Sequence, residues 1–309
     1  MQFKDNDIIS MNQLDRKDIE RVFKIADKIK VVVESGESLS TNKNVAILFY
    51  QPSTRTRLGF EAASLKLGAK PFGFSDPKVT RGGDFYKESL LDIVRVVDKL
   101  ADVIVIRHPE NHAAQIVADH TKASVINAGD GNNHHPTQAL QDLYTIYKEH
   151  NGLDNLIIAL VGDFKIRSFR SIIEGLVQFK IKKLYLIPSP NEDITKDVTQ
   201  TLELANFDWE IRDSIEEIIP EVDVLELNGI NHPYRSLDYQ TPDTHKVTLD
   251  NLKLAKSNLS ILHTMPRKDE LPIEIDQTSY NKYFTQVEYG MYVKMALITL
   301  VLGNESMLD

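Results

Sequence analysis

The sequence contains no cysteine, which excludes disulfides, thiolate nucleophiles and cysteine-ligated metals. It also lacks a G-x-G-x-x-G motif: the turn at Val161–Asp163 follows an apolar run but continues without it, so no nicotinamide cofactor is expected. No apolar run approaches the roughly 20 residues that span a bilayer. The start of the chain, Met1–Asp7, has no apolar segment of the kind found in signal peptides. We therefore predict a cytoplasmic protein that does not bind membranes.

Positive charge is in the minority. Lysine and arginine number 36 against 45 aspartates and glutamates, and the formal net charge is −9. This balance argues against non-specific binding of nucleic acid, but a local basic cluster can still hold a small anion. With 309 residues, 42% of them hydrophobic, the chain is long enough for two domains of about 150 residues each.

One stretch joins a buried strand to a helix that begins with hydroxyl and basic side chains. The apolar run Val45–Tyr50 predicts a buried parallel strand, and Ser53–Arg57 follows it after a proline turn. Helix N-termini bind anions through free N–H groups and the helix dipole, and hydroxyls and guanidinium groups add donors. We predict a site for phosphate oxygens, from a phosphate ester or an acyl phosphate. The alternative is a helix cap with surface arginines.

Two further groups of polar side chains follow predicted strands. Arg107 comes directly after Val103–Ile106, while His135 and Gln138 open a helix after Ser124–Asn127 and a glycine-rich turn. Ligands bind outside the carboxyl ends of parallel strands, so one site can collect these side chains. His135 and Gln138 lie one helical turn apart and can face the same ligand. Taken alone, His135 would be interpreted as a helix-capping or core histidine.

Strands and helices alternate along the chain, which predicts an α/β protein with two doubly wound parallel-sheet domains and a cleft between them. The predicted domains are residues 1–150, which bind the phosphate-containing ligand, and residues 151–287. The last segment, residues 288–309, is predicted as a helix that packs back on the first domain. Further strands are expected at Pro71–Phe74, Leu156–Val161, Leu184–Ile187, Val222–Leu227 and Ser260–His263, and helices at Ser10–Val33, Leu90–Val97 and Gly290–Leu302.

These motifs carry a family resemblance. The stretch from Phe49 to Glu61 resembles the carbamoyl-phosphate-binding motif of the aspartate and ornithine carbamoyltransferases, and the resemblance continues in Arg107-His108-Pro109 and in Asn127–Gln138. It covers nearly the whole chain and is closest to the catalytic chain of the aspartate branch. It implies transfer of the carbamoyl group of carbamoyl phosphate to the amine of an amino acid, L-aspartate in pyrimidine biosynthesis.

The resemblance and the chemistry assign roles to the side chains of the first domain. Positioning and electrostatics suffice for this reaction, so no metal or organic cofactor is expected. Gln138 can accept a hydrogen bond from the carbamoyl NH2 group. The phosphate is expected to be held by Ser53, Thr54, Arg55 and Thr56, and the carbonyl oxygen by Arg55, Thr56, Arg107 and His135.

The amino-acid acceptor is expected in the second domain. By resemblance Arg167 binds a substrate carboxylate, although an ungapped alignment places Ser168 there. Where the family has a second arginine and a glutamine, this chain has Gly229 and Asn231. The resemblance also implies a cis peptide bond between Met265 and Pro266, with carbonyls that face the reacting amine, although the proline could also belong to an ordinary loop. Because glycine cannot hold a carboxylate, another amino acid as acceptor stays open.

A loop from Asp76 to Ser89 departs from the family pattern. Gly82 falls where the family has a serine, and Lys87, or Tyr86 in an ungapped alignment, where it has a lysine that reaches in from a neighbouring subunit. Lys87 could equally be a surface lysine. Gln51 replaces a glutamate that braces arginines between the domains. The resemblance implies a homotrimer. A third possibility is a non-catalytic paralogue that acts as a structural subunit.

Overall fold

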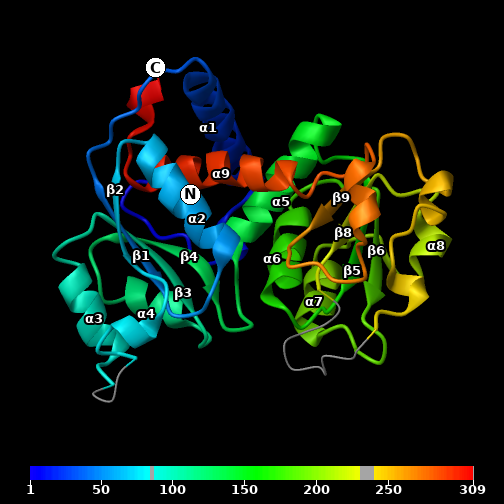
Figure 1. Ribbon diagram of the computed structural model, residues 1–309, viewed down its shortest axis with the longest axis horizontal. Coiled ribbons are helices and arrows are strands. Elements are labelled where there is room, and N and C mark those ends of the chain that lie inside the picture. The colour runs from blue at the N-terminus through cyan, green and yellow to red at the C-terminus, as the bar shows by residue number, and fades with distance from the viewer. Residues whose placement is uncertain (84–86, 230–239, 309) are drawn as a thin grey trace. The chain divides into compact units, whose positions relative to one another are not determined.

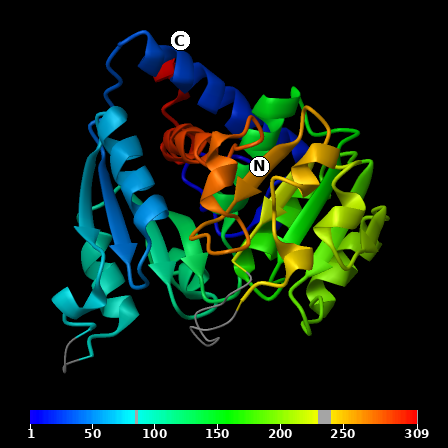
Figure 2. The same ribbon diagram turned by 45° about the vertical axis from the view of Figure 1, so that its right-hand side comes forward.

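Two compact units make up the chain in the computed structural model, which describes residues 1–83, 87–229 and 240–308. Unit 1 comprises Met1–Gln141 and the residues from Val287 onward, and unit 2 comprises Asp142–Gln286. Each unit contains its own parallel sheet and helices (Figures 1 and 2). The division falls within helix α5 (Pro136–His150), whereas the domain prediction places the boundary directly after it.

The sheet of unit 1 has four parallel strands in the order β2-β1-β3-β4. The apolar runs of β1 and β3 form strands because their side chains are buried on both faces of the sheet, whereas β2 is mostly exposed. β4 continues beyond the predicted strand, into residues expected to form a turn, because these residues are buried as well. The strands are β1 (Asn44–Phe49), β2 (Lys70–Phe74), β3 (Val103–His108) and β4 (Ser124–Asp130).

Helices cover this sheet. On one face, apolar side chains of α3 and α4 pack against alternate residues of β1 and β3, including Leu48 and Ile104. α2 contacts β1 and β2. The long helix α1 begins with a capping box formed by Asp15 and Asp18. The α-helices with residues in unit 1 are α1 (Arg16–Glu34), α2 (Thr54–Lys66), α3 (Leu90–Val97), α4 (Ala113–Ala118), the first turns of α5, and most of α9 (Thr285–Val301).

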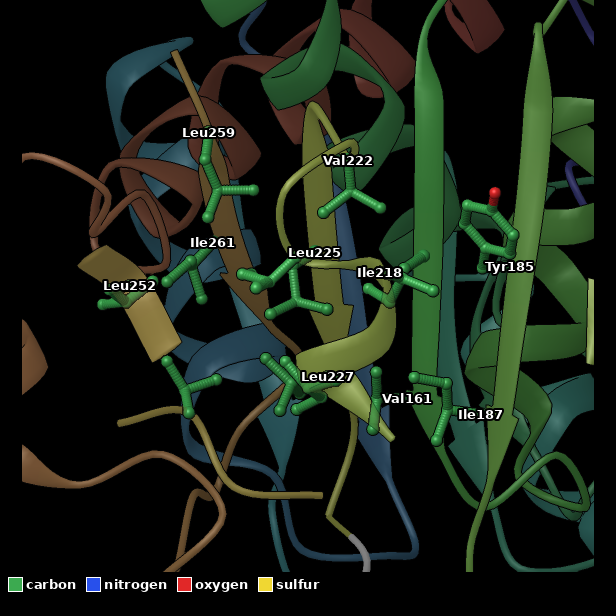
Figure 3. Close-up of a cluster of buried hydrophobic side chains, with 14 of the residues drawn as sticks. Val161, Tyr185, Ile187, Ile218, Val222, Leu225, Leu227, Leu252, Leu259 and Ile261 are labelled. Carbon is green, nitrogen blue, oxygen red and sulfur yellow. The ribbon is translucent and has the colours of Figure 1, made fainter. Parts of the chain in front are cut away.

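The sheet of unit 2 has five parallel strands in the order β7-β6-β5-β8-β9. On one face, inward residues such as Val161, Leu225 and Ile261 pack against α8 and the loops around it (Figure 3). The elements are β5 (Ile157–Gly162), β6 (Lys183–Pro188), β7 (Trp209–Ile211), β8 (Val224–Leu227), β9 (Ser260–His263), α6 (Arg167–Leu176), α7 (Lys196–Leu204) and α8 (Ile215–Ile218).

The predicted fold class of two parallel-sheet α/β domains is confirmed, and every predicted strand is present. β7 was not predicted, because Trp209–Ile211 is too short to show a period. The closing helix begins at Thr285, more than a turn before the predicted Gly290. Within the described ranges no helix is long and apolar enough to cross a membrane.

Candidate active site

The first turn of α2, in unit 1, has the features of a helix terminus that can bind an anion. Ser53 is the N-cap residue, with extended backbone, and its hydroxyl makes no capping hydrogen bond. Thr54, Arg55 and Thr56 fill the first turn, which carries no acidic side chain. The first N–H groups of a helix have no partner within the helix. Backbone and hydroxyl donors therefore converge at this end of α2, as the sequence predicts.

The two arginines of this turn differ in their surroundings. Arg57 lies 2.8 Å from Glu61 in an ion pair along α2. Arg55 is half-buried, and within the described part of the chain it makes no hydrogen bond or ion pair. Burial lowers the pKa of Arg55, but a guanidinium group stays charged at neutral pH. Arg55 is therefore the cation that can bind a ligand without breaking an existing ion pair.

Arg107 and His135 meet at the carboxyl end of the same sheet. Arg107 pairs in register with Phe49, so the ends of β1 and β3 lie side by side. Its Nη1 atom donates to the carbonyl oxygen of Ala128 at 3.3 Å and lies 3.4 Å from Nε2 of His135. The pair can therefore present a guanidinium group and an imidazole nitrogen to one ligand oxygen.

His135 is held at the start of α5. It is buried, and its Nδ1 atom accepts a hydrogen bond from the backbone N–H of Gln138 at 3.3 Å. The hydroxyl of Thr137 lies 3.2 Å from the same nitrogen. Gln138, one turn along, is partly exposed. The ring edge that carries Nε2 is thus directed by the first turn of the helix.

The glycine-rich turn before α5 depends on two buried polar residues that the sequence analysis did not single out. Asn127 Nδ2 donates to Asp130 Oδ1 at 2.8 Å, and Asn127 Oδ1 accepts from the backbone of Gly129 at 2.8 Å. Gly131 has a φ of +48°, and a Cβ there would lie 1.9 Å from Oδ1 of Asn111. These contacts fix where α5 begins. The sequence signal for these two residues is an asparagine and an aspartate that flank Ala128-Gly129 at the end of an apolar strand.

The loop that contains Lys87 combines an uncommon backbone conformation with close packing at Gly82. Lys87 is exposed, adopts a left-handed conformation with φ of +49°, and forms no hydrogen bond or ion pair with residues that the structure describes. The backbone N–H of Glu88 donates to the carbonyl oxygen of Arg81 at 3.0 Å and closes the loop. A Cβ on Gly82 would lie 2.8 Å from Cδ1 of Ile93, so the family's serine does not fit here without a shift. Tyr86 lies outside the described residues.

In unit 2, Arg167 and Ser168 begin α6 and both are buried. The buried hydroxyl of Ser168 makes no hydrogen bond with any described residue. The turn before them is fixed from β8: Asn228 Oδ1 accepts from the N–H of Asp163 at 2.8 Å, and Nδ2 donates to its carbonyl oxygen at 2.9 Å. Asn228, which the sequence analysis did not select, thereby positions the turn that leads to Arg167. Asn231 lies outside the described residues.

The bond between Met265 and Pro266 is cis, and it follows β9. Nδ1 of buried His263 accepts from the N–H of Met265 at 2.7 Å, so the ring proton lies on Nε2, which is 3.0 Å from Glu270 Oε1. His263 and Glu270 therefore hold the turn from the core side. In unit 1 the first turn of α2, Arg107 and the first turn of α5 thus lie at the carboxyl ends of β1, β3 and β4. In unit 2 Arg167 and the Met265-Pro266 turn follow the carboxyl ends of β5 and β9.

A basic, hydroxyl-lined site at the carboxyl ends of parallel strands defines a protein that binds an anionic substrate. Comparison with protein families matches residues 6–148 to the carbamoyl-P binding domain of aspartate/ornithine carbamoyltransferase and residues 154–301 to its Asp/Orn binding domain. The chain belongs to the aspartate/ornithine carbamoyltransferase family. The predictions of this family and of a carbamoyltransferase enzyme are confirmed.

Named relatives support this result. The aspartate carbamoyltransferase catalytic subunit of Thermococcus kodakarensis is 39% identical over 311 residues, which cover 98% of this chain and 99% of the relative. The subunit of Clostridium novyi is 36% identical over 94% of this chain and 95% of its own. The solved aspartate transcarbamoylase of Trypanosoma cruzi in complex with carbamoyl phosphate is 28% identical, has a TM-score of 0.90 and covers 97% of both chains.

Proposed function

We propose that the protein transfers the carbamoyl group of carbamoyl phosphate to the amine of L-aspartate, in pyrimidine biosynthesis. The observation that carries the proposal is that the first turn of α2 follows β1 in unit 1, while Arg107 at the end of neighbouring β3 lies 3.4 Å from His135. The Trypanosoma cruzi enzyme, solved in complex with carbamoyl phosphate and aspartate, has a TM-score of 0.88 to this chain.

The phosphate group is held by the N-terminal amides of α2 with the side chains of Ser53, Thr54 and Arg55. The carbonyl oxygen lies among Thr56, Arg107 and His135, whose donors interact more strongly as negative charge develops on it. Gln138 orients the carbamoyl group by accepting from its NH2. The donors are pre-organised by the sheet edge and by the turn that Asn127 and Asp130 fix, so little reorganisation is needed at the moment of reaction.

The chemical step joins the amine nitrogen to the carbonyl carbon and breaks the bond from that carbon to the phosphate oxygen. The acceptor ammonium gives up two protons, one of which ends on the inorganic phosphate and the other in solvent. Arg167 binds an acceptor carboxylate, and the carbonyls of Met265 and Pro266 face its amine. Asn231 contributes to the same pocket, and Lys87 is supplied by the loop of a neighbouring subunit.

A homotrimer in the cytoplasm completes the proposal. β2 is an edge strand, and a groove of about 470 Å³ beside it is lined by Arg57, Glu61 and apolar side chains that include Phe72 and Val79. Val79 is 75% exposed, and Leu65, which also lines the groove, is 65% exposed. Apolar side chains exposed along a sheet edge suit burial against another copy of the chain. Light scattering coupled to size-exclusion chromatography measures the mass of the protein in solution, which should be three times that of one chain.

Gly229 favours an alternative function, in which an amino acid other than aspartate is the acceptor, because glycine has no side chain to bind a carboxylate. The test is phosphate release from carbamoyl phosphate with purified protein and a panel of amino acids that includes aspartate. Turnover with aspartate above all others supports the proposal. Turnover only with another amino acid corrects the acceptor. Binding of carbamoyl phosphate without turnover on any amine refutes the catalytic proposal and favours a structural subunit.

A further inference from the structure

A buried lysine contacts α2 and α5, the two helices whose first turns carry the proposed anion site. Lys294 of α9 is 4% exposed. Its ammonium group donates to the side-chain oxygen of Gln141 at 2.8 Å and to the carbonyl oxygen of Gly290 at 3.0 Å. Burying an ammonium group is costly, and such groups are retained where they make specific contacts. No step of the reaction described above uses this side chain.

The position of Lys294 relates it to both halves of the site. Gln141 is on α5, one turn beyond Gln138. On α2, a Cβ at Gly59 would lie 3.1 Å from Cδ and Cε of Lys294, so the lysine stem rests on the helix one turn beyond Arg55. The ammonium group also lies 5.9 Å from the ring of Phe60, within the range of a cation–π contact. One side chain thus touches α2, α5 and its own helix.

Two glycines provide the space for this arrangement. At Gly59 an added Cβ would be in tight contact with the stem of Lys294, and at Gly290 it would lie 1.9 Å from the side-chain oxygen of Gln141. Glycine within a helix lowers its stability relative to alanine. Both glycines are in helix interiors, so the close approach of α2, α5 and α9 is maintained at some cost in helix stability. α9 passes close to α2 in unit 1 (Figure 1).

We propose that Lys294 is a positioning residue, whose buried ammonium and stem set the separation between the phosphate-binding turn of α2 and the His135–Gln138 turn of α5. The inference rests on the proposed function, because those two turns must hold the phosphate and the carbamoyl group of one ligand. A small displacement of catalytic groups is enough to slow a reaction by orders of magnitude. Lys294 acts through α2 and Gln141, without contact with the substrate.

The test compares two lysines that both contact α9. K294M keeps the length of the stem and removes the ammonium group. K30M is the matched control: Lys30 of α1 lies 5.2 Å from the ring of Tyr289 and 6.0 Å from that of Tyr292, and contacts neither α2 nor α5 in any described interaction. Calorimetric titration with inorganic phosphate gives Kd, and steady-state assays give kcat and KM for carbamoyl phosphate.

For K294M we expect the Kd for phosphate to rise about tenfold and kcat to fall by up to about 100-fold, because the separation between the two turns is no longer fixed. The thermal midpoint should fall as well, because the oxygens of Gln141 and Gly290 lose their donor. K294R, which keeps a cation and donors that reach Gln141, should recover most of the activity. For K30M, the Kd for phosphate and kcat should both stay within twofold of those of the unsubstituted protein. A purely structural role would lower the midpoint but leave kcat and the Kd for phosphate within twofold at temperatures well below it.

Phosphate binding and kcat of K294M within twofold of the unsubstituted protein would overturn the inference, as would equal losses in K294M and K30M. If K294M does not fold, Q141M removes the acceptor at the other end of the contact, and unchanged phosphate binding in Q141M has the same meaning. Failure of the unsubstituted protein to bind phosphate or carbamoyl phosphate would instead refute the anion site itself, and with it the proposed function.

Discussion

Replacing Arg55 and replacing Arg57 should have opposite consequences for binding and stability, although the two residues are two positions apart in one motif. Arg55 is half-buried, and no described residue pairs with it, whereas Arg57 forms an ion pair with Glu61 at 2.8 Å. The surroundings of each guanidinium group therefore predict which one serves the ligand.

The magnitudes follow from these contacts. A hydrogen bond to a charged group contributes about 1.5–3 kcal/mol, so R55A should raise the Kd for inorganic phosphate by roughly 10- to 150-fold. The same change removes a partly desolvated cation, so the unliganded protein should be as stable as before or slightly more so. R57A removes a partly exposed pair along a helix, which contributes about 0.3–0.5 kcal/mol, and should change phosphate affinity less than twofold.

The assay is calorimetric titration of each variant with phosphate, together with thermal unfolding in the absence of ligand. Because Arg57 lines the groove beside β2, the mass of each variant in solution is measured as well. Equal losses of affinity in R55A and R57A, at unchanged mass, would refute the assignment. So would a large loss of unliganded stability in R55A, because it would mean that Arg55 supports the fold.

Three further predictions concern unit 2 and the turn before α5. Burial, and then the neighbouring carboxylate of Asp142, raise the pKa of Glu226 above its value in the unfolded chain, so stability is complete at low pH and falls as pH rises through the folded pKa. The free energy of unfolding of E226Q should therefore exceed that of the unsubstituted protein by about 1–3 kcal/mol at about pH 8 and equal it at about pH 4. Denaturant unfolding at both pH values measures this, and equal gains at both would contradict the ionisation of Glu226 as the cause. N228A leaves the N–H and carbonyl of Asp163 without their partner, so it should cost about 1–3 kcal/mol and raise the KM for the acceptor more than that for carbamoyl phosphate; an unchanged acceptor KM in steady-state kinetics would show that the turn does not position the acceptor site. G131A introduces a side chain at a φ of +48° and 1.9 Å from a neighbouring oxygen, so it should lower stability by about 1–3 kcal/mol and reduce kcat; a thermal midpoint equal to that of the unsubstituted protein would contradict the predicted strain.

Several departures from the family pattern receive a physical description from the structure. At Gly82, the space that a serine side chain would need is occupied by Ile93. Lys87 adopts a left-handed backbone conformation, which L side chains rarely take. These features belong to the loop of a single chain, and the role of Lys87 as a group donated to a neighbouring subunit stays a prediction.

The sequence determined the elements and the kind of chemistry. Continuous apolar runs such as Val45–Tyr50 can be accommodated only in strands buried on both faces, so the parallel α/β class followed from them. Hydroxyls and arginines directly after such a strand indicated an anion site, because helix N-termini and guanidinium groups have this chemistry wherever they occur. The cis bond at Met265-Pro266 was expected from the family resemblance and is present.

Only the tertiary structure decided which groups meet. The 3.4 Å approach of Arg107 to His135 depends on the register of β1, β3 and β4 and on the turn that Asn127 and Asp130 fix, and such contacts between distant positions leave no periodic trace in a sequence. Arg55 and Arg57 are alike in the motif, but Arg57 forms an ion pair with Glu61, whereas no described residue pairs with Arg55. Lys294 illustrates the limit most clearly: it sits in an apolar run that predicts a helix, and its role follows from two glycines and a glutamine that the fold brings to it.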